Sequence, residues 1–121
     1  MVTHTIELSG NLLKKADSTA TLTYAIDPKV TYTEYTENEI TVVATSSSSI
    51  NLGGIINPTF FYAETDNPVT IKFFKGANVI ASAFPINTSL LITPNTTGRF
   101  GTVSITNNGA SDADVKIFVA G

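Results

Sequence analysis

"VSITNNGASDADVKIFVAG", residues 103–121, contains two runs in which apolar and polar side chains alternate. The apolar residues of each run fall on one side of it, and they are Val103, Ile105, Val115, Ile117 and Val119. Such alternation places these side chains on a single face of a β-strand. Asn108-Gly109 lies between the runs, so we expect it to begin a hairpin that joins the two strands through a loop of residues 109–114.

The rest of the chain repeats this pattern of short apolar runs. The further runs are rich in β-branched and aromatic residues and cover residues 19–26, 39–45, 59–64, 69–74, 79–84 and 89–93. Glycine, proline and asparagine separate them at close spacing. The sequence therefore predicts an all-β protein, a single antiparallel β-sandwich of jelly-roll or immunoglobulin-like type. Only NLLKKAD, residues 11–17, favours a helical turn, and it is too short to be stable without tertiary support.

Alternation also assigns the faces of the predicted strands. The run at 69–74 adds three side chains to the inward-facing set, namely Val69, Ile71 and Phe73. We expect three more side chains to join this core, namely Phe60, Tyr62 and Leu91. Phe74 and Phe118 then lie on outward faces, where apolar rings need a cover from a second sheet or a partner. We therefore predict that Phe74 and Phe118 are self-association residues.

The N-terminal third has a different pattern. Residues 27–39, DPKVTYTEYTENE, alternate Thr, Tyr and Glu, so neither face of this run is strongly apolar. Such a strand sets its register poorly by itself and pairs best with an edge. Two interpretations stay open: residues 1–45 form an extended arm, or they add strands to the sandwich core of residues 46–121. In both cases a chain of 121 residues fits one structural domain.

Composition excludes several classes of protein. A formal charge of −3 argues against the basic surface of a nucleic-acid-binding protein, and the absence of cysteine excludes disulfides and thiolate metal sites. The N-terminus lacks the pattern of a signal peptide, and no apolar run is long enough to span a bilayer. We expect a soluble protein made in the cytosol that binds neither nucleic acid nor membrane. Asn87 and Asn95 match the glycosylation pattern, but without an export signal we expect neither to be modified.

Catalytic constellations are not evident in the sequence. His4 is the only histidine, and its place near a terminus argues against a catalytic or metal-binding role. Two carboxylate pairs, Glu64 with Asp66 and Asp112 with Asp114, have the composition of a calcium site or of paired acid–base hydrolysis. Neither pair has the ligand spacing of a calcium loop, and Asp in turns commonly caps backbone groups. We expect no catalytic residue, no metal site and no cofactor, and therefore no enzyme.

Tyrosines provide a different hypothesis, that of a binding surface. Four of them, Tyr24, Tyr32, Tyr35 and Tyr62, would suit a platform on which sugar rings stack. The chain has no tryptophan, and three of the four tyrosines belong to the N-terminal third. Carbohydrate binding stays open as an alternative.

From Ser49 to the end of the chain, the order of motifs resembles small β-rich virion proteins of tailed bacteriophages, of the head decoration (cement) or accessory type. The motifs are INLGG (50–54), FFYAETDNPVTIKF (60–73), SLLIT (89–93) and VSITNNGASDADVKIFVAG (103–121). In this resemblance TDNPVT, residues 65–70, corresponds to the central hairpin of a β-sandwich.

The resemblance implies a structural virion protein that binds the outside of a tailed-phage head and stabilises the shell. Its implied partners are the major capsid protein and further copies of itself, as a homo-oligomer with a trimer favoured. Its implied location is the outer capsid surface of the virion, after synthesis in the host cytoplasm, with residues 1–45 facing the capsid or a neighbour. The alternatives are a tail- or fibre-associated adhesion module that binds host glycans and a hydrolase built on one of the carboxylate pairs.

Overall fold

The computed structural model describes residues 4–7, 10–16, 19–26, 29–50, 52, 54–80, 83–95 and 99–121. Within these residues the chain forms thirteen β-strands and no helix. Residues 11–17 favoured a helical turn, but residues 11–16 form a strand instead, as part of β2 (Gly10–Ala16). Asp17 lies outside the described residues. β2 pairs antiparallel with β3 (Thr19–Ile26), and these interstrand hydrogen bonds replace those that a single helical turn would make.

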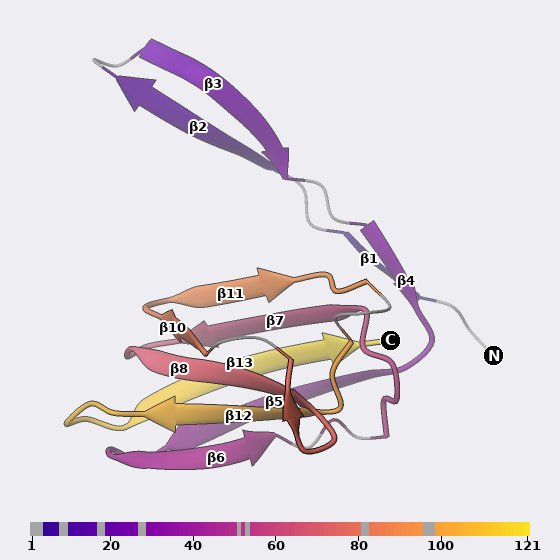
Figure 1. The fold of residues 1–121 in the computed structure, drawn as a ribbon. Coiled ribbons are helices and arrows are strands. Elements are labelled where there is room, and N and C mark those ends of the chain that lie inside the picture. The colour runs from indigo at the N-terminus through magenta and orange to yellow at the C-terminus, as the bar shows by residue number, and fades with distance from the viewer. Residues whose placement is uncertain are drawn as a thin grey trace.

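Two antiparallel sheets pack face to face as a sandwich (Figure 1). The first has the order β10 (Phe84–Ile86), β8 (Val69–Lys75), β12 (Thr102–Asn107) and β6 (Ser46–Ile50), and β9 (Asn78–Val79) also pairs with β8. The second has the order β11 (Ser89–Ile92), β7 (Phe60–Thr65), β13 (Ala113–Ala120) and β5 (Tyr35–Val42). The predicted all-β sandwich is confirmed. From β5 to β13 each connection crosses between the two sheets, except that β8, β9 and β10 all belong to the first sheet, and the two strand orders are those of a jelly roll.

The N-terminal strands form a separate projection. β1 (His4–Glu7) pairs with β4 (Lys29–Tyr32), and β2 pairs with β3, so each pair is a two-stranded ribbon of its own. Figure 1 shows the β2–β3 hairpin at the top of the view, away from both sheets. We call β1 to β4 the arm. Strand β5 also falls within the first 45 residues, but it pairs with β13 along its whole length and is therefore part of the sandwich.

The core lies between the two sheets and is built from the alternating residues of their inner faces. All eight side chains that alternation assigned inward from the central strands are at most 3% exposed, and they are Val69, Ile71, Phe73, Val103, Ile105, Val115, Ile117 and Val119. Phe61, Phe73 and Phe100 form an aromatic group inside it, with ring centroids 4.8–5.8 Å apart. Burial of these apolar side chains is the main term that holds the sandwich together.

The inward assignment is wrong by one residue in β7 and β11. Phe61 and Ala63 belong to the core, with Leu90 and Ile92 packed against it, whereas Tyr62 pairs with Leu91 in the register of the two strands, and both are only half-buried. Phe60 is buried, but its ring lies against Phe118 on the outer face. A one-residue shift moves every side chain of a strand to its other face, and the FFY run gives no alternation to fix the phase.

The two expected hairpins are also wrong. β12 and β13 belong to different sheets, so residues 108–112 cross from one sheet to the other. Residues 66–68 make the same kind of crossing between β7 and β8. The turn residues were recognised correctly, but a turn signal does not distinguish a hairpin from a corner of a sandwich, because both need a reversal of the chain between two strands.

Candidate functional site

The loop carboxylates lie together where the chain crosses between the sheets. Asp66 Oδ1 accepts a hydrogen bond from the Asp114 backbone N–H at 2.8 Å, and Asp114 Oδ1 accepts one from the Thr41 hydroxyl at 2.7 Å. Asp112 Oδ1 accepts one from the Ala44 backbone N–H at 3.0 Å. These bonds tie the β5–β6, β7–β8 and β12–β13 corners to one another, which is the capping role that aspartate commonly has in turns.

Asn107 connects these corners from the interior of the sandwich, and no sequence pattern singled it out. It is 1% exposed, and its Nδ2 donates to the Val42 carbonyl at 3.0 Å and to the Ser111 carbonyl at 2.8 Å. Its Oδ1 accepts a hydrogen bond from the Gly109 backbone N–H at 2.9 Å. The side chain therefore satisfies three backbone groups at the point where β12 leaves its sheet.

Glu64 lines a shallow depression together with Asp66 and Asp114 of the corners, and it makes a hydrogen bond of its own on the sheet face. Its Oε1 accepts a hydrogen bond of 2.6 Å from the Tyr62 hydroxyl. This hydrogen bond, with partial burial and the negative charge of Glu64 as smaller causes, raises the pKa of Tyr62 above its ordinary value. Among the described residues, no group of three or more His, Asp or Glu side chains is placed to hold a metal ion. The side chain of His4 lies outside the described residues.

Aromatic side chains gather on the outer face of the second sheet. The ring of Tyr35 stacks on Phe118 with centroids 5.7 Å apart and planes 13° apart. Tyr32 and Phe60 approach the same ring edge-on, at 6.2 and 6.0 Å. We call Tyr32, Tyr35, Phe60 and Phe118 the aromatic cluster. Because Tyr32 belongs to β4, the cluster attaches the base of the arm to the sandwich.

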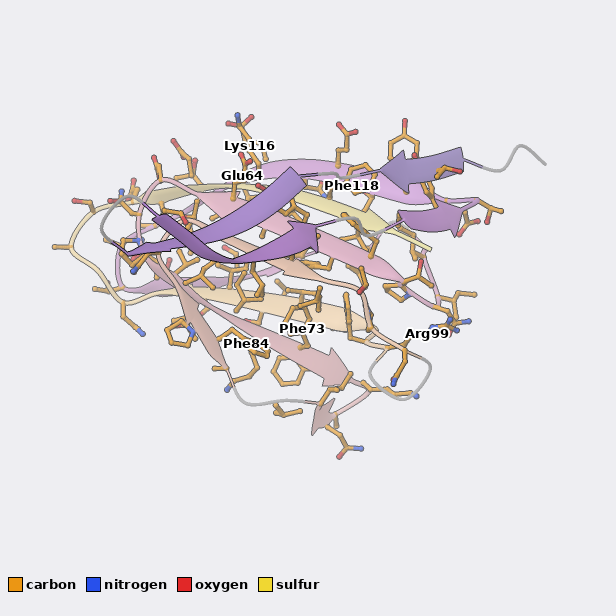
Figure 2. The ribbon with its side chains drawn as sticks, turned by 90° about the horizontal axis from the view of Figure 1, so that it is seen from above. Glu64, Phe73, Phe84, Arg99, Lys116 and Phe118 are labelled. Atoms are coloured by element: carbon orange, nitrogen blue, oxygen red, sulfur yellow. The ribbon has the colours of Figure 1, made fainter. Side chains whose placement is uncertain are left out.

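A shallow depression of about 430 Å³ lies beside the aromatic cluster. Its lining consists of Glu37, Asn38, Glu39, Tyr62, Glu64, Lys116, Ile117 and Phe118. Lys116 stands between Glu39 of β5 and Glu64 of β7 in the register of the sheet. Figure 2 shows Glu64 and Lys116 side by side, and Phe84 on the other side of the sandwich. The depression therefore combines aromatic surface with three carboxylates and one ammonium group.

The predicted self-association residues lie on different faces of the molecule. Phe118 is on the outer face of the second sheet, half-buried because the aromatic cluster covers it. Phe74 is also half-buried but belongs to β8 of the first sheet, opposite Thr102 of β12. The two phenylalanines cannot form one continuous patch on a single subunit.

The predicted tyrosine platform is brought together in part. Tyr32 and Tyr35 belong to the aromatic cluster, and Tyr62 is the cross-strand neighbour of Phe118 on the same face. The side chain of Tyr24 in β3 lies outside the described residues. Sequence reasoning had no signal for Phe118 as the centre of this group, because the contact of β4 and β5 with β13 joins residues that are more than 80 positions apart.

Comparisons with known proteins identify no family. No protein-family model matches the chain, and no curated protein matches it. A solved structure from Bacillus endospore appendages, which form a family of disulfide-linked pili, shares 18% sequence identity over 70% of this chain and 84% of that one, with a TM-score of 0.44. A likeness of this size carries no argument about function. The described part of the chain contains no helix that is long and apolar enough to cross a membrane.

Proposed function

We propose that this protein is a structural subunit that decorates the outside of a tailed-phage head and stabilises the shell by binding the major capsid protein. The observation that carries the structural role is the arm. Its β2–β3 hairpin pairs with no strand of the sandwich in the described part of the chain, and it extends away from both sheets in Figure 1. An isolated two-stranded hairpin is marginally stable in water, so this one needs a neighbouring molecule to order it.

The chemistry of the described surface supports a structural role over a catalytic one. The carboxylates that were candidates for hydrolysis accept hydrogen bonds from Thr41, Ala44, Tyr62 and Asp114, which fixes them as parts of the corners and of the sheet face. The order of motifs between residues 49 and 121 supports the phage head as the assembly in question. A structural subunit needs a folded domain and a segment that contacts a neighbouring molecule. The sandwich and the arm supply these two parts.

Quantitative mass spectrometry of purified phage particles tests this proposal. We expect a copy number of the same order as that of the major capsid protein. Particles assembled without the protein should lose DNA at a lower temperature, and adding the purified protein should restore the higher temperature. A few copies per particle, or complete absence from the particle, would contradict the decoration role.

The aromatic cluster and the adjoining depression favour a second candidate, an adhesion module of the tail or fibre that binds host glycans. Aromatic faces suit sugar rings, and carboxylates accept hydrogen bonds from sugar hydroxyls. A glycan array probed with the purified protein tests this function. We expect Tyr62→Ala and Tyr35→Ala to abolish binding. Lys72→Ala, on the outer face of the other sheet, is the matched control and should leave binding unchanged.

A further inference from the structure

The outer edge of β5 offers backbone hydrogen bonds that no strand in the described part of the chain takes up. Glu34 and Gly121 exchange both of their backbone hydrogen bonds, at 3.0 and 2.9 Å, which sets the phase of the ladder between β5 and β13. In an antiparallel pair the bonded residues alternate, so every second residue of β5 directs its N–H and C=O away from β13. These residues are Tyr35, Glu37, Glu39 and Thr41.

This edge has no proline, glycine or bulge to interrupt it, and its only protection against another strand is the charge of Glu37 and Glu39. β5 pairs with β13 over eight consecutive residues without a bulge, and it contains neither proline nor glycine. The other edges of the sandwich are shorter: β6 has five residues, β11 has four, and β10 has three, one of which is Pro85. A long and regular edge is the kind of surface to which another strand of suitable charge adds.

The β2–β3 hairpin has the complementary properties. It offers strands of seven and eight residues, long enough to match β5, and it has no sheet of its own to join. Its own β5 is a poor target, because the Thr33 and Glu34 N–H groups both donate to the Gly121 carbonyl and fix the chain where the arm leaves the sandwich. From that point the hairpin extends away from its own sandwich in Figure 1.

The charges of the two strands favour the β2–β3 hairpin over a second β5 as the partner of the β5 edge. Residues 1–32 carry three lysines and three carboxylates, whereas residues 33–121 carry seven carboxylates and four basic side chains, so the net charge of −3 belongs to the sandwich. β2 carries Lys14 and Lys15, and the outer edge of β5 carries Glu37 and Glu39. Pairing β5 with the β5 of another copy would oppose glutamates, which is unfavourable, whereas a lysine-bearing strand complements them.

We propose that the β2–β3 hairpin of one copy adds to the outer edge of β5 in a second copy and extends the β11–β7–β13–β5 sheet. Donor and acceptor are different surfaces, so the contact is head-to-tail and closes into a ring when the rotation between copies permits it. A ring of three copies is one such closed form. The inference concerns contacts between copies of this chain and stands apart from the binding of a capsid.

Cysteine cross-linking tests this contact directly, because the chain has no cysteine of its own. The full chain with Lys15→Cys is mixed with the full chain carrying Glu39→Cys and mildly oxidised. We expect a disulfide-linked heterodimer in high yield, and at least a tenfold lower yield when Lys72→Cys, on the first sheet, replaces Glu39→Cys. Equal yields, or no cross-link at all, would overturn the proposal.

Backbone substitution tests whether the β5 edge itself is used. Glu39→Pro removes an N–H that faces the open edge, so we expect it to weaken association at least tenfold by light scattering after gel filtration, with a folded sandwich. Asn38→Pro is the matched variant: it removes an N–H that faces β13, and we expect it to lower the melting temperature. Association that survives Glu39→Pro would refute the use of this edge.

Charge reversal gives a readout that does not depend on proline. Glu37→Lys with Glu39→Lys should weaken association about tenfold, and Lys14→Glu with Lys15→Glu in the partner chain should restore it. A wild-type chain that stays monomeric at high concentration, or reversed charges that have no effect, would overturn the inference. If the hairpin instead cross-links only to capsid protein on particles, the decoration role stands and the proposed contact between copies does not.

Discussion

At the scale of single residues, Asn107 is the polar side chain on which the corners of the sandwich depend. Asn107→Ala would leave the Val42 and Ser111 carbonyls and the Gly109 N–H without their partner, so we expect it to lower the free energy of unfolding by about 3 kcal/mol. Asn107→Asp should cost more, because a carboxylate oxygen would then face the two carbonyl oxygens. Urea unfolding measures both, with Asn108→Ala at the exposed next position as the control. Equal stability of all three variants would contradict this role.

The hydrogen bond between Tyr62 and Glu64 leads to a second prediction at the scale of single residues. Because the hydrogen bond to Glu64 raises the pKa of Tyr62, Glu64→Gln should lower that pKa toward its ordinary value of about 10. A group whose pKa is raised by folding stabilises the protein below its unfolded pKa and loses that contribution as the pH rises through the folded value. The stability advantage of wild type over Tyr62→Phe should therefore shrink above pH 10. Spectrophotometric titration of the tyrosines checks the pKa, with Glu39→Gln as the control, and an unchanged titration in Glu64→Gln would contradict the assignment.

At the scale of elements, the alternation of apolar and polar residues predicted correctly which face of a strand is buried. It failed for strands in which both faces carry apolar residues, and for the connections between strands. The inward residues predicted for β8, β12 and β13 are all in the core, because a two-residue period in a half-buried strand leaves only one face for apolar side chains. β7 begins with two phenylalanines and a tyrosine, so the sequence does not show which of these side chains face the core. The corners at residues 66–68 and 108–112 depend on which strands pair at long range, which the turn residues do not encode.

The aromatic cluster shows the same limit for the candidate site. The sequence showed that the outward phenylalanines need other apolar groups to shield them from water. For Phe118 these groups are Tyr32 and Tyr35 of its own chain. That contact exists because β5 pairs with β13 and carries the end of β4 to the same face. Neighbours brought together by strand pairing have no local signal in a single sequence.

Phe118 also makes a prediction about the element that it anchors. Phe118→Asp would remove ring contacts with Tyr32, Tyr35 and Phe60, which together contribute about 2 kcal/mol, so we expect lower stability and a detached arm base. The sequence-based prediction that Phe74 and Phe118 are self-association residues requires Phe74→Asp and Phe118→Asp to dissociate the oligomer, as measured by light scattering, with the sandwich still folded. Lys116→Asp, two residues earlier on the same face as Phe118, is the control for added negative charge. Unfolding of the whole sandwich by both phenylalanine variants would make them structural residues only.

At the scale of the whole molecule, the chain consists of a sandwich of two sheets and an arm whose strands, in the described residues, pair only with one another. The core residues that the structure describes belong to positions 42–119, in the strands of the two sheets or in the segments between them. For residues 1–45 the sequence left an arm and further sandwich strands open as alternatives, because residues 27–39 lack a strongly apolar face, and β5 proved to be an edge strand of the sandwich. Stability and assembly should therefore be separable properties of this protein.

Replacement of residues 10–26 by a short Gly-Ser linker tests this separation. Since the β2–β3 hairpin pairs with no strand of the two sheets in the described part of the chain, we expect the melting temperature to change by less than about 2 °C, whereas Ile105→Ala, which empties part of the core, should lower it by about 10 °C. The linker variant should be monomeric where the wild type associates, because the strand that adds to a neighbour is gone. In the wild type, hydrogen exchange should show that the amides of β2 and β3 are protected only when the protein is associated. A linker variant that melts as low as Ile105→Ala would place the hairpin within the stabilising core, and one that still associates would move the contact between copies to another surface.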